Sequence, residues 1–505
     1  MVSVAQLKVC RLWLIACLCI PFVAAETGFS ASSENNTLPL QDWTEQQIKI
    51  PALNGSLWGG IATYADDSGS ELFNIQADTR LTPASTLKLV TTAAALELLG
   101  PNYRFQTRLY AEKTPDTNGR LAGSLYVRGG GDATLGSSRV TGAETSTAVL
   151  NKWVNALKKE GIRYIDGDII ADESLFEGPS IATKVNWANI GNYFAAPATP
   201  LCFNDNLFTI HFKPQPLPNR RATVESVTPG IEGLRLESFV TTDGKTKKDN
   251  AYVYGAPGQY HLQIFGTIPT NKNGFAIKGA LPDPALFTVQ SLKKTLEENG
   301  ITVSGTAKTV QQEPDYSSMQ LLHTYKSPAL KDIVVIVNKR SFNLYAEMLL
   351  RALALEGGQK ASLENGLAVL NKFLKDNKIT TAQEAVIYDG SGLSRDNLIT
   401  PRTLVKTLNF MAKSPNFDYY YKSLATPDDR GDLLILRRFL KPQKKVNEVR
   451  IKGGTIDNTK ALAGYVYDKE GRLISFAFMA NNLAGKDEGL FRLHENIIKQ
   501  LLESN

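Results

Sequence analysis

The feature that most constrains the fold is a change of pattern along the chain. Both ends mix strand and helix patterns, whereas residues 102–317 are rich in short alternating strands, glycines and turns. The 505 residues are too many for one ordinary domain of about 150 residues. Since the two ends together supply about five strands with helices for both faces, we expect one α/β domain made of residues 27–101 and 318–505. Residues 102–317 would then be one or two inserted β-rich domains.

Alternating and helical patterns define the expected elements of this split domain. Thr82 is a candidate N-cap and Pro83 suits the first helical turn, while Gly100 and Pro101 end the helix that we expect from Thr82 to Leu99. Expected strands are Gly59–Tyr64 and Leu72–Ile75, which form a hairpin, and Val449–Lys452, Ala461–Tyr467 and Leu473–Met479. Further helices are expected at Leu330–Val337, Asn343–Glu356 and Leu363–Asn377.

Two smaller patterns also predict structure. A final helix carries Leu490, Leu493, Ile497 and Leu501 on one face. Its polar face is mixed rather than basic, which favours a core helix over an amphipathic membrane anchor. Inside the middle region, residues 149–167 and 289–305 resemble each other, because each runs from a helix through a glycine and an isoleucine into a strand.

The N-terminus has the composition of an export signal. Lys8 and Arg11 precede an apolar stretch, Leu12–Ala25, whose end supplies the small residues that a signal peptidase needs. We therefore predict a signal peptide over residues 1–25 and an exported protein, in the periplasm or at the cell surface. Leu14–Cys17 also fits a lipoprotein signal, so lipid anchoring is the alternative. No later run of 18 apolar residues predicts a transmembrane helix.

The positions of the cysteines and the net charge limit which structures and functions the chain can have. Cys10, Cys17 and Cys19 lie in the predicted signal, so the mature chain keeps only Cys202 and cannot form an intrachain disulfide. The 56 basic and 50 acidic residues give a net charge of +6, or +4 once Lys8 and Arg11 are removed. This mild, dispersed charge does not resemble a nucleic-acid binder.

Several common catalytic and metal-binding motifs are absent from the sequence. The four histidines are isolated, and no H-E-x-x-H, C-x-x-C or G-x-S-x-G motif occurs. What remains is Ser85-Thr86-Leu87-Lys88 at the start of a predicted helix. Residues three apart share a helix face, so the Lys88 amine can reach the Ser85 hydroxyl and act as its base if burial lowers the lysine pKa. The dipole at a helix start favours developing negative charge.

Two further elements follow in order. Ser341-Phe342-Asn343 lies between two predicted helices, and Lys452-Gly453-Gly454 follows a predicted strand. Taken singly, Asn343 could be a helix cap and the glycines a bulge or turn. The order S-x-x-K, S-x-N, K-x-G, with 256 positions between the two serines and 111 between Ser341 and Lys452, is much more specific than any single member.

This combination resembles the D-alanyl-D-alanine carboxypeptidase/endopeptidase family, the class C low-molecular-mass penicillin-binding proteins. The resemblance covers nearly all of the predicted mature chain and implies a serine β-lactamase/transpeptidase-like domain, α/β with a central five-stranded antiparallel sheet flanked by helices. A long insertion between the first two motifs distinguishes this family from ordinary β-lactamases. Further matching segments are Pro83–Thr86, Leu99–Pro101, Gly129–Leu135, Ile165–Asp168, Asp172–Phe176, Tyr193–Pro197 and Asp389–Arg395.

The resemblance also implies roles for individual residues. Ser85 would form an acyl-enzyme with Lys88 as base, Ser341 would relay a proton to the leaving D-alanine, Asn343 would hold the peptide, and Lys452 would support the electrostatics. The oxyanion hole would use the backbone N–H of Ser85 and that of Thr455 or Ile456. The substrates would be peptidoglycan stem peptides, with β-lactams as covalent inhibitors and with neither cofactor nor metal. Substrate binding would involve Gly453, Gly454, Thr455 and Arg395.

Two departures from the family pattern affect substrate binding. The middle residue of the third motif is usually a threonine or serine whose hydroxyl contacts the substrate carboxylate, whereas here it is Gly453. Weaker carboxylate binding is expected unless Thr455 or Arg395 compensates. Relatives can also carry an acidic residue that faces a basic stem-peptide side chain, but Ala188–Gly191 offers none.

Three functional hypotheses follow from the sequence. The first is an exported serine DD-peptidase that acts as carboxypeptidase, as cross-link endopeptidase or as both. Gly453 motivates the second, a catalytically impaired peptidoglycan-binding protein. A β-lactamase is the third and is disfavoured by the long insertion.

Overall fold

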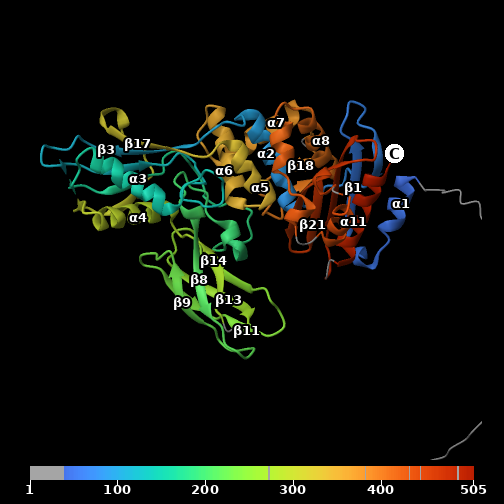
Figure 1. Ribbon diagram of the computed structural model, residues 1–505, viewed down its shortest axis with the longest axis horizontal. Coiled ribbons are helices and arrows are strands. Elements are labelled where there is room, and N and C mark those ends of the chain that lie inside the picture. Colours follow the sequence, from blue (N-terminus) through green and yellow to red (C-terminus); the bar gives the residue numbers. More distant parts are fainter. Residues whose placement is uncertain are drawn as a thin grey trace, which may run out of the picture. The chain divides into compact units, whose positions relative to one another are not determined.

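A five-stranded antiparallel sheet joins the two ends of the chain in the computed structural model (Figure 1). Its order is β2-β1-β22-β21-β20, which confirms the expected sheet. The structure describes residues 39–504 apart from 271–272, 382, 431–432, 444 and 486–487, so the predicted signal peptide lies outside the described residues. The strands are β1 (Leu57–Tyr64), β2 (Glu71–Ile75), β20 (Val449–Ile456), β21 (Thr459–Tyr467) and β22 (Leu473–Asn481).

Helices cover both faces of this sheet because its strands are apolar on both sides. In β22, Phe476 and Phe478 belong to the core shared with helix α11 (Glu488–Glu503), whereas Ala477 and Met479 belong to the core around helix α2 (Lys88–Leu98). Helices α1 (Leu40–Gln47) and α10 (Leu434–Leu440) join α11. The other face carries α5 (Leu330–Lys339), α6 (Asn343–Glu356), α7 (Leu363–Asp376), α8 (Pro401–Ala412) and α9 (Phe417–Ser423).

The C-terminal helix is a core helix, as the sequence predicts. Leu490, Leu493, Ile497 and Leu501 of α11 are all buried against the sheet. Burying one such side chain contributes roughly 1.5–3 kcal/mol. No helix in the described part of the chain is both long and apolar enough to cross a membrane.

The start of the motif-bearing helix differs from the expectation. A 3-10 turn, η2 (Ala84–Leu87), precedes α2, and the predicted N-cap Thr82 is wrong. The Thr82 hydroxyl instead donates a hydrogen bond to the carbonyl of Arg395. Tertiary contact with a distant loop has therefore replaced the local cap, and Ser85 lies in the tighter 3-10 turn rather than in the α-helix.

The third motif also has a different local structure from the expected one. Strand β20 continues to Ile456, so Gly453 and Gly454 lie within it rather than after it. Their pairing with Leu462 and Ala461 of β21 is regular, without a bulge. The sheet accommodates both glycines. Because they lack side chains, neighbouring residues can pack closely against the strand on its two faces.

Residues between α2 and α5 form several smaller sheets. A mixed sheet has the order β16-β7-β5-β3-β17, and a three-stranded parallel sheet has the order β15-β6-β4. Their strands are β3 (Gln106–Ala111), β4 (Arg120–Leu121), β5 (Leu125–Arg128), β6 (Tyr164–Ile165), β7 (Ile169–Asp172), β15 (Thr302–Val303), β16 (Ala307–Val310) and β17 (Gln320–Lys326). Strand β17 begins after residue 317, where the sequence placed the end of the insertion, yet it pairs with β3 in this sheet.

The two similar sequence segments form two similar units. Helix α3 (Ser146–Lys159) leads through Gly161 into β6, and helix α4 (Pro284–Glu298) leads through Gly300 into β15. Both glycines have positive φ angles, +76° and +81°, which favours glycine at these helix ends. The two strands pair in parallel, so the repeated pattern marks neighbouring parts of one sheet.

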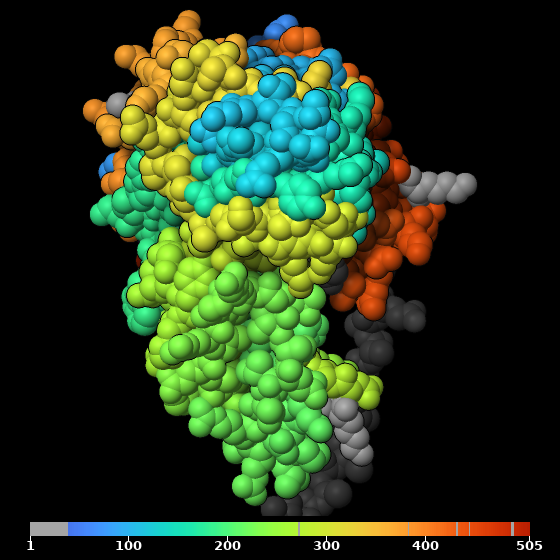
Figure 2. Space-filling view, turned by 90° about the vertical axis from the view of Figure 1, so that its left-hand side faces the viewer, coloured from blue at the N-terminus to red at the C-terminus, as the bar shows by residue number. Residues whose placement is uncertain are grey.

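Seven more strands form a separate lobe, coloured green to yellow-green in Figure 2. They make a β14-β8-β9 sheet and a second sheet in which β10, β11 and β12 all pair with β13. The division into domains at residues 101 and 318 stays a prediction, because Leu40–Asn505 form one compact unit by their contacts. The strands are β8 (Leu207–Lys213), β9 (Thr223–Thr228), β10 (Arg235–Ser238), β11 (Thr241–Asp243), β12 (Asn250–Tyr254), β13 (His261–Pro269) and β14 (Phe275–Ala280).

Candidate active site

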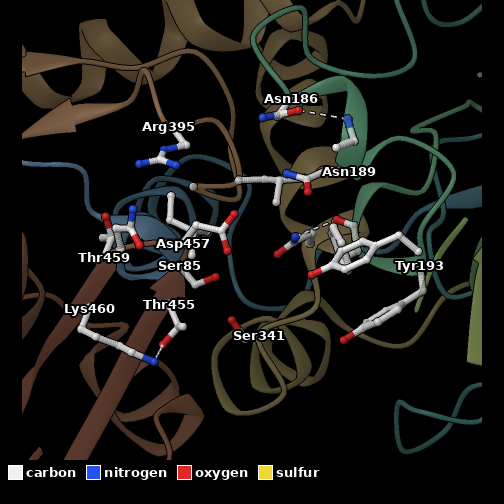
Figure 3. Close-up of a pocket in the computed structure, with 18 of the residues that line it drawn as sticks. Ser85, Asn186, Asn189, Tyr193, Ser341, Arg395, Thr455, Asp457, Thr459 and Lys460 are labelled. Atoms are coloured by element: carbon white, nitrogen blue, oxygen red, sulfur yellow. Dashed lines mark hydrogen bonds between the residues drawn. The ribbon is translucent and has the colours of Figure 1, made fainter. Parts of the chain in front are cut away.

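The three sequence motifs meet at a cleft of about 800 Å³ (Figure 3). Ser85 and Ser341 line it, with Thr455 of β20 on one side and Tyr193 on the opposite wall. Lys88 and Lys452 do not line the cleft because both side chains are buried behind it. The predicted motif residues, which are far apart in the sequence, thus form one site.

Close packing holds the turn that carries Ser85 in place. Ala84 has a positive φ of +47°, which is uncommon for a residue with a side chain and marks a strained turn. A Cβ on Gly454 would lie 2.6 Å from the Pro83 carbonyl oxygen and 2.9 Å from the Ser85 nitrogen. Glycine at 454 therefore allows strand β20 to pack directly against the backbone of the turn that carries Ser85.

Lys88 makes the contact that the S-x-x-K spacing predicts. Its Nζ donates to Ser85 Oγ at 2.9 Å, to Asn343 Oδ1 at 2.6 Å and to the Ser391 carbonyl at 2.6 Å. Burial lowers the Lys88 pKa to about 7, although the carboxyl groups of Asp389 and Glu347 act in the opposite direction. A lysine with this pKa has a substantial neutral fraction at neutral pH, which a base requires.

The loop that supplies the Ser391 carbonyl is anchored by those same two carboxyl groups. Asp389 accepts hydrogen bonds from the backbone N–H groups of Gly392 and Ser394 at 2.7 and 2.6 Å, and Glu347 accepts from that of Ser391 at 2.9 Å. Burial and the nearby Glu347 raise the Asp389 pKa to about 7. Sequence reasoning found the Asp389–Arg395 segment by resemblance but missed that it positions Lys88.

Ser341 and Lys452 form the second hydroxyl–amine pair. Lys452 Nζ donates to Ser341 Oγ at 2.8 Å and to the Gly453 carbonyl at 2.7 Å. Burial, the neighbouring Lys88 and Arg430 all lower the pKa of Lys452. Ser341 has a positive φ of +56°, so its hydroxyl is presented from a strained backbone between α5 and α6.

Asn343 connects the site to the region between α2 and α5. It is the first residue of α6, but its side chain does not cap that helix. The Asn343 amide accepts from Lys88 through Oδ1 and donates through Nδ2 to the Phe194 carbonyl at 2.7 Å. Because both ends of the amide have partners, its orientation is fixed.

The four predicted substrate-binding residues surround the strand side of the cleft. Thr455 and Arg395 line the cleft directly, and the Thr455 hydroxyl accepts a hydrogen bond from Lys460 at 3.3 Å. Gly454 faces Ser85, whereas Gly453 faces the guanidinium of Arg430 on the other side of β20. Arg430 was not among the predicted site residues.

The region between α2 and α5 supplies the opposite wall of the cleft. Tyr252 and Tyr254 of β12 line it together with Tyr193 and Asn189. The Trp187 and Tyr254 rings lie 5.2 Å apart beside it. No motif marks β12 in the sequence, so its contribution could not be predicted. Asp457, at the turn between β20 and β21, places a carboxylate in the cleft opposite the Ala188–Gly191 segment, which has none.

The arrangement supports nucleophilic catalysis. A buried amine with a lowered pKa contacts one serine hydroxyl, and the serine of a second lysine–serine pair lines the same cleft. Among the described residues, no group of three or more His, Cys, Asp and Glu side chains is placed to hold a metal ion.

A comparison with protein families decides the classification. The model of the D-Ala-D-Ala carboxypeptidase 3 (S13) family matches residues 40–499, most of the chain. The protein belongs to this family. The resemblance drawn from the motifs is thereby confirmed, and the family assignment identifies the protein as a hydrolase, a serine-type D-Ala-D-Ala carboxypeptidase.

Individual relatives of this family cover nearly the whole chain. A D-alanyl-D-alanine carboxypeptidase of Actinomadura sp. (strain R39) is 27% identical over 487 residues, which are 93% of this chain and 86% of that protein. The D-alanyl-D-alanine carboxypeptidase DacB of Haemophilus influenzae is 24% identical over 87% of this chain and 88% of that protein. The solved structure of penicillin binding protein 4 from the same organism matches with a TM-score of 0.77 and 23% identity, over 91% of this chain and 99% of that one. The last comparison supports the fold.

Proposed function

We propose that Ser85 is the nucleophile of this serine DD-peptidase and that Lys88 is its base. The observation that carries this proposal is the 2.9 Å contact between the Lys88 amine and the Ser85 hydroxyl, made by a lysine with no exposed surface. Substrates would be peptidoglycan stem peptides that end in D-Ala-D-Ala, and the enzyme would release the last D-alanine, cleave D-Ala cross-links or do both.

Acylation would begin with proton transfer from Ser85 Oγ to neutral Lys88 Nζ. The oxygen then attacks the carbonyl carbon of the penultimate D-alanine, and the carbonyl electrons move to its oxygen. Backbone N–H groups of Ser85 and of Thr455 or Ile456 would stabilise this oxyanion. The close approach of β20 to the Ser85 turn at Gly454 supports this assignment, because it brings the two backbones together.

Collapse of the intermediate would break the peptide bond and leave an ester on Ser85. The departing D-alanine nitrogen needs a proton. Ser341 would donate its hydroxyl proton to that nitrogen and take the Ser85 proton from Lys88 in exchange, which leaves Lys88 neutral again, while Lys452 stabilises the change of charge at the Ser341 hydroxyl. The 2.8 Å contact between Lys452 Nζ and Ser341 Oγ supports this pairing. Asn343 would hold the peptide backbone. A water molecule, deprotonated by Lys88, would then hydrolyse the ester and restore Ser85.

We also propose that the mature enzyme is exported to the periplasm or cell surface, where its substrate lies. The predicted signal peptide over residues 1–25 supports this location. Mass analysis of the protein purified from a producing bacterium checks it, because cleavage after Ala25 leaves a chain that begins at Glu26. A lipid-modified Cys17 at the N-terminus would show the alternative, anchored form.

The assignment of Ser85 can be tested with a fluorescent penicillin. A penicillin-type inhibitor should label the wild type, and mass mapping should place the adduct on Ser85. Ser85→Ala should abolish labelling, whereas Ser56→Ala, outside the cleft, should leave it unchanged. Equal labelling of Ser85→Ala and wild type would contradict the assignment of Ser85 as the nucleophile. A structure of the Haemophilus influenzae relative in complex with a β-lactam supports this choice of probe.

The natural reaction can be identified from products. Purified peptidoglycan digested with the mature enzyme should lose terminal D-alanine, open its cross-links or do both, and these products differ in mass. Binding to peptidoglycan without any product would favour the catalytically impaired alternative. Rapid hydrolysis of penicillin without action on D-Ala-D-Ala peptides would favour a β-lactamase.

A further inference from the structure

The missing hydroxyl at Gly453 leaves a space that another side chain occupies. A Cβ built on Gly453 would lie 2.6 Å from Nη2 and 2.7 Å from Cζ of Arg430, and its closest contact is Nη1 of the same guanidinium. A serine or threonine at position 453 would therefore displace the guanidinium of Arg430 from this place. The cationic group stands where the side chain of the middle motif residue would begin.

The backbone around Arg430 explains this position. Ala425 and Ile451 exchange two backbone hydrogen bonds, 3.0 and 2.8 Å long, so the segment pairs with the outer edge of β20. The chain then turns through η7 (Pro427–Asp429), where the Asp429 carboxylate accepts from the backbone and the hydroxyl of Thr426. This turn places Arg430 beside the edge strand β20. Its neighbour there is Gly453, which lies two residues after Ile451.

Three basic side chains gather around this part of β20. Lys452 lies on one face, Arg430 contacts Gly453 on the other, and Lys460 donates to the Thr455 hydroxyl. Arg430 is close enough to Lys452 to disfavour the charged form of that lysine and lower its pKa. Arg430 also borders a small hollow together with Thr455 and Lys460, and these two residues in turn line the cleft. Arg430 is not one of the residues that line the cleft, but it and Lys460 place positive charge beside Gly453 and Thr455, where the strand carries no motif hydroxyl.

We infer that Arg430 replaces the absent hydroxyl and, with Thr455, binds the terminal carboxylate of the D-Ala-D-Ala substrate. This inference rests on the proposed function. A guanidinium can bind a carboxylate through two parallel N–H bonds, which are stronger than the neutral hydrogen bond of a hydroxyl. Gly453 is then the residue that makes room for the arginine, rather than a defect in the motif.

The test compares two substrates that differ only at the C-terminus, an acyl-D-Ala-D-Ala peptide and its carboxamide. Arg430→Ala should lower kcat/KM for the free carboxylate roughly 10- to 100-fold, mainly through KM, and should change that for the carboxamide little. Arg438→Ala removes an exposed arginine from α10 and serves as the matched control, with both rates unchanged. Thermal melting of each variant separates loss of fold from loss of binding.

A reciprocal exchange tests the spatial argument. Gly453→Thr alone should weaken carboxylate selectivity, because the new side chain displaces the guanidinium from its place beside β20. The double variant, Arg430→Ala with Gly453→Thr, should recover most of that selectivity, because a hydroxyl then fills the vacated space. Such recovery depends on the carboxylate-binding role and would not follow from a purely structural role of Arg430.

Other outcomes of these experiments would reject the role of Arg430, move it to another residue or reject the proposed function. Equal losses on the carboxylate and the carboxamide for Arg430→Ala would reject the inference, and so would an unchanged variant. A carboxylate-selective loss in Arg395→Ala instead would transfer the role to that residue. If the wild type neither releases D-alanine nor reacts with penicillin, the proposed function fails instead, and this outcome is distinct from an active wild type whose selectivity does not depend on Arg430.

Discussion

At the scale of the residue, burial is what converts an ordinary lysine into a base. Lys88 has no exposed surface and three hydrogen-bond acceptors within 2.9 Å, so its pKa is set by the balance between desolvation and two nearby carboxyl groups. Desolvation is the larger effect and lowers the pKa to about 7. Lys88 is thus neutral above this pH and charged below it.

Acylation should therefore depend on pH through Lys88. The rate constant for labelling by penicillin should be constant above pH 8 and fall about tenfold per pH unit below the Lys88 pKa of about 7, because the ammonium form cannot accept the Ser85 proton. Stopped-flow labelling between pH 5 and 9 measures this. Lys88→Arg, which stays charged, should be inactive throughout. A wild-type rate that stays constant down to pH 5 would contradict the assignment of Lys88 as base.

A second prediction at this scale concerns Gly454. Gly454→Ala should reduce penicillin labelling about 100-fold, because the new methyl group forces β20 away from Pro83 and Ser85, and small misplacements at a reacting centre are costly. Gly357→Ala is the matched control, since a Cβ there meets its nearest atom at 3.4 Å. Wild-type labelling by Gly454→Ala would show that the close approach is unnecessary.

At the scale of the element, two connections position the site more than the regular elements do. The 3-10 turn before α2 holds Ser85, and the Asp389–Arg395 loop holds Lys88 through the Ser391 carbonyl. Both are packed backbone to backbone, since a Cβ on Gly392 would collide with the Ala84 carbonyl. The positive φ of Gly392, +79°, also favours glycine there.

The C-terminal helix gives the prediction that belongs to this scale. Leu493→Ala should lower the free energy of unfolding by about 3 kcal/mol, through lost burial and a residual cavity beneath α11. Urea denaturation measures the change. Asn496→Ala, on the exposed face of the same helix, should alter it by less than about 0.5 kcal/mol. An unchanged stability in Leu493→Ala, accompanied by lost binding to lipid vesicles, would instead support a membrane anchor.

At the scale of the whole molecule, the cleft depends on segments from both sides of the split sheet and from the strands between them. Ser85 lies before the strands that separate α2 from α5, Ser341 and Thr455 lie after them, and Tyr252 belongs to one of them. The Asn343 amide donates to the Phe194 carbonyl, so a residue of the second motif is itself held by the region between α2 and α5. We therefore expect the insertion to contribute to substrate selection.

Substitution of a tyrosine in the wall of the cleft should affect reactions with large substrates more than those with small ones. Tyr252→Ala should lower kcat/KM for long stem peptides about tenfold, because they extend along the wall, yet leave the penicillin labelling rate within about twofold. Tyr164→Ala changes an exposed tyrosine of β6 outside the cleft and should affect neither rate. Equal losses for penicillin and peptides in Tyr252→Ala would indicate a general disturbance of the site.

Much of the fold could be read from local patterns. Alternating apolar residues predicted the five strands of the central sheet, and helix α6 has the predicted bounds, Asn343–Glu356. The predictions failed where distant segments meet. Thr82 looks like a cap but bonds to Arg395, and the glycines of the third motif look like a strand end but pair within β20. Contacts of this kind cannot be predicted from local secondary-structure propensity.

The sequence by itself determined the family, the order of the elements and the three motifs, because motif spacing and hydrophobic period are properties of the chain. Tertiary structure alone decided the surroundings of those motifs: the burial that lowers the Lys88 pKa, the tyrosines of β12 across the cleft and the arginine over Gly453. These features depend on residues more than 20 positions from the groups they affect, and folding brings them together through packing that no local pattern encodes.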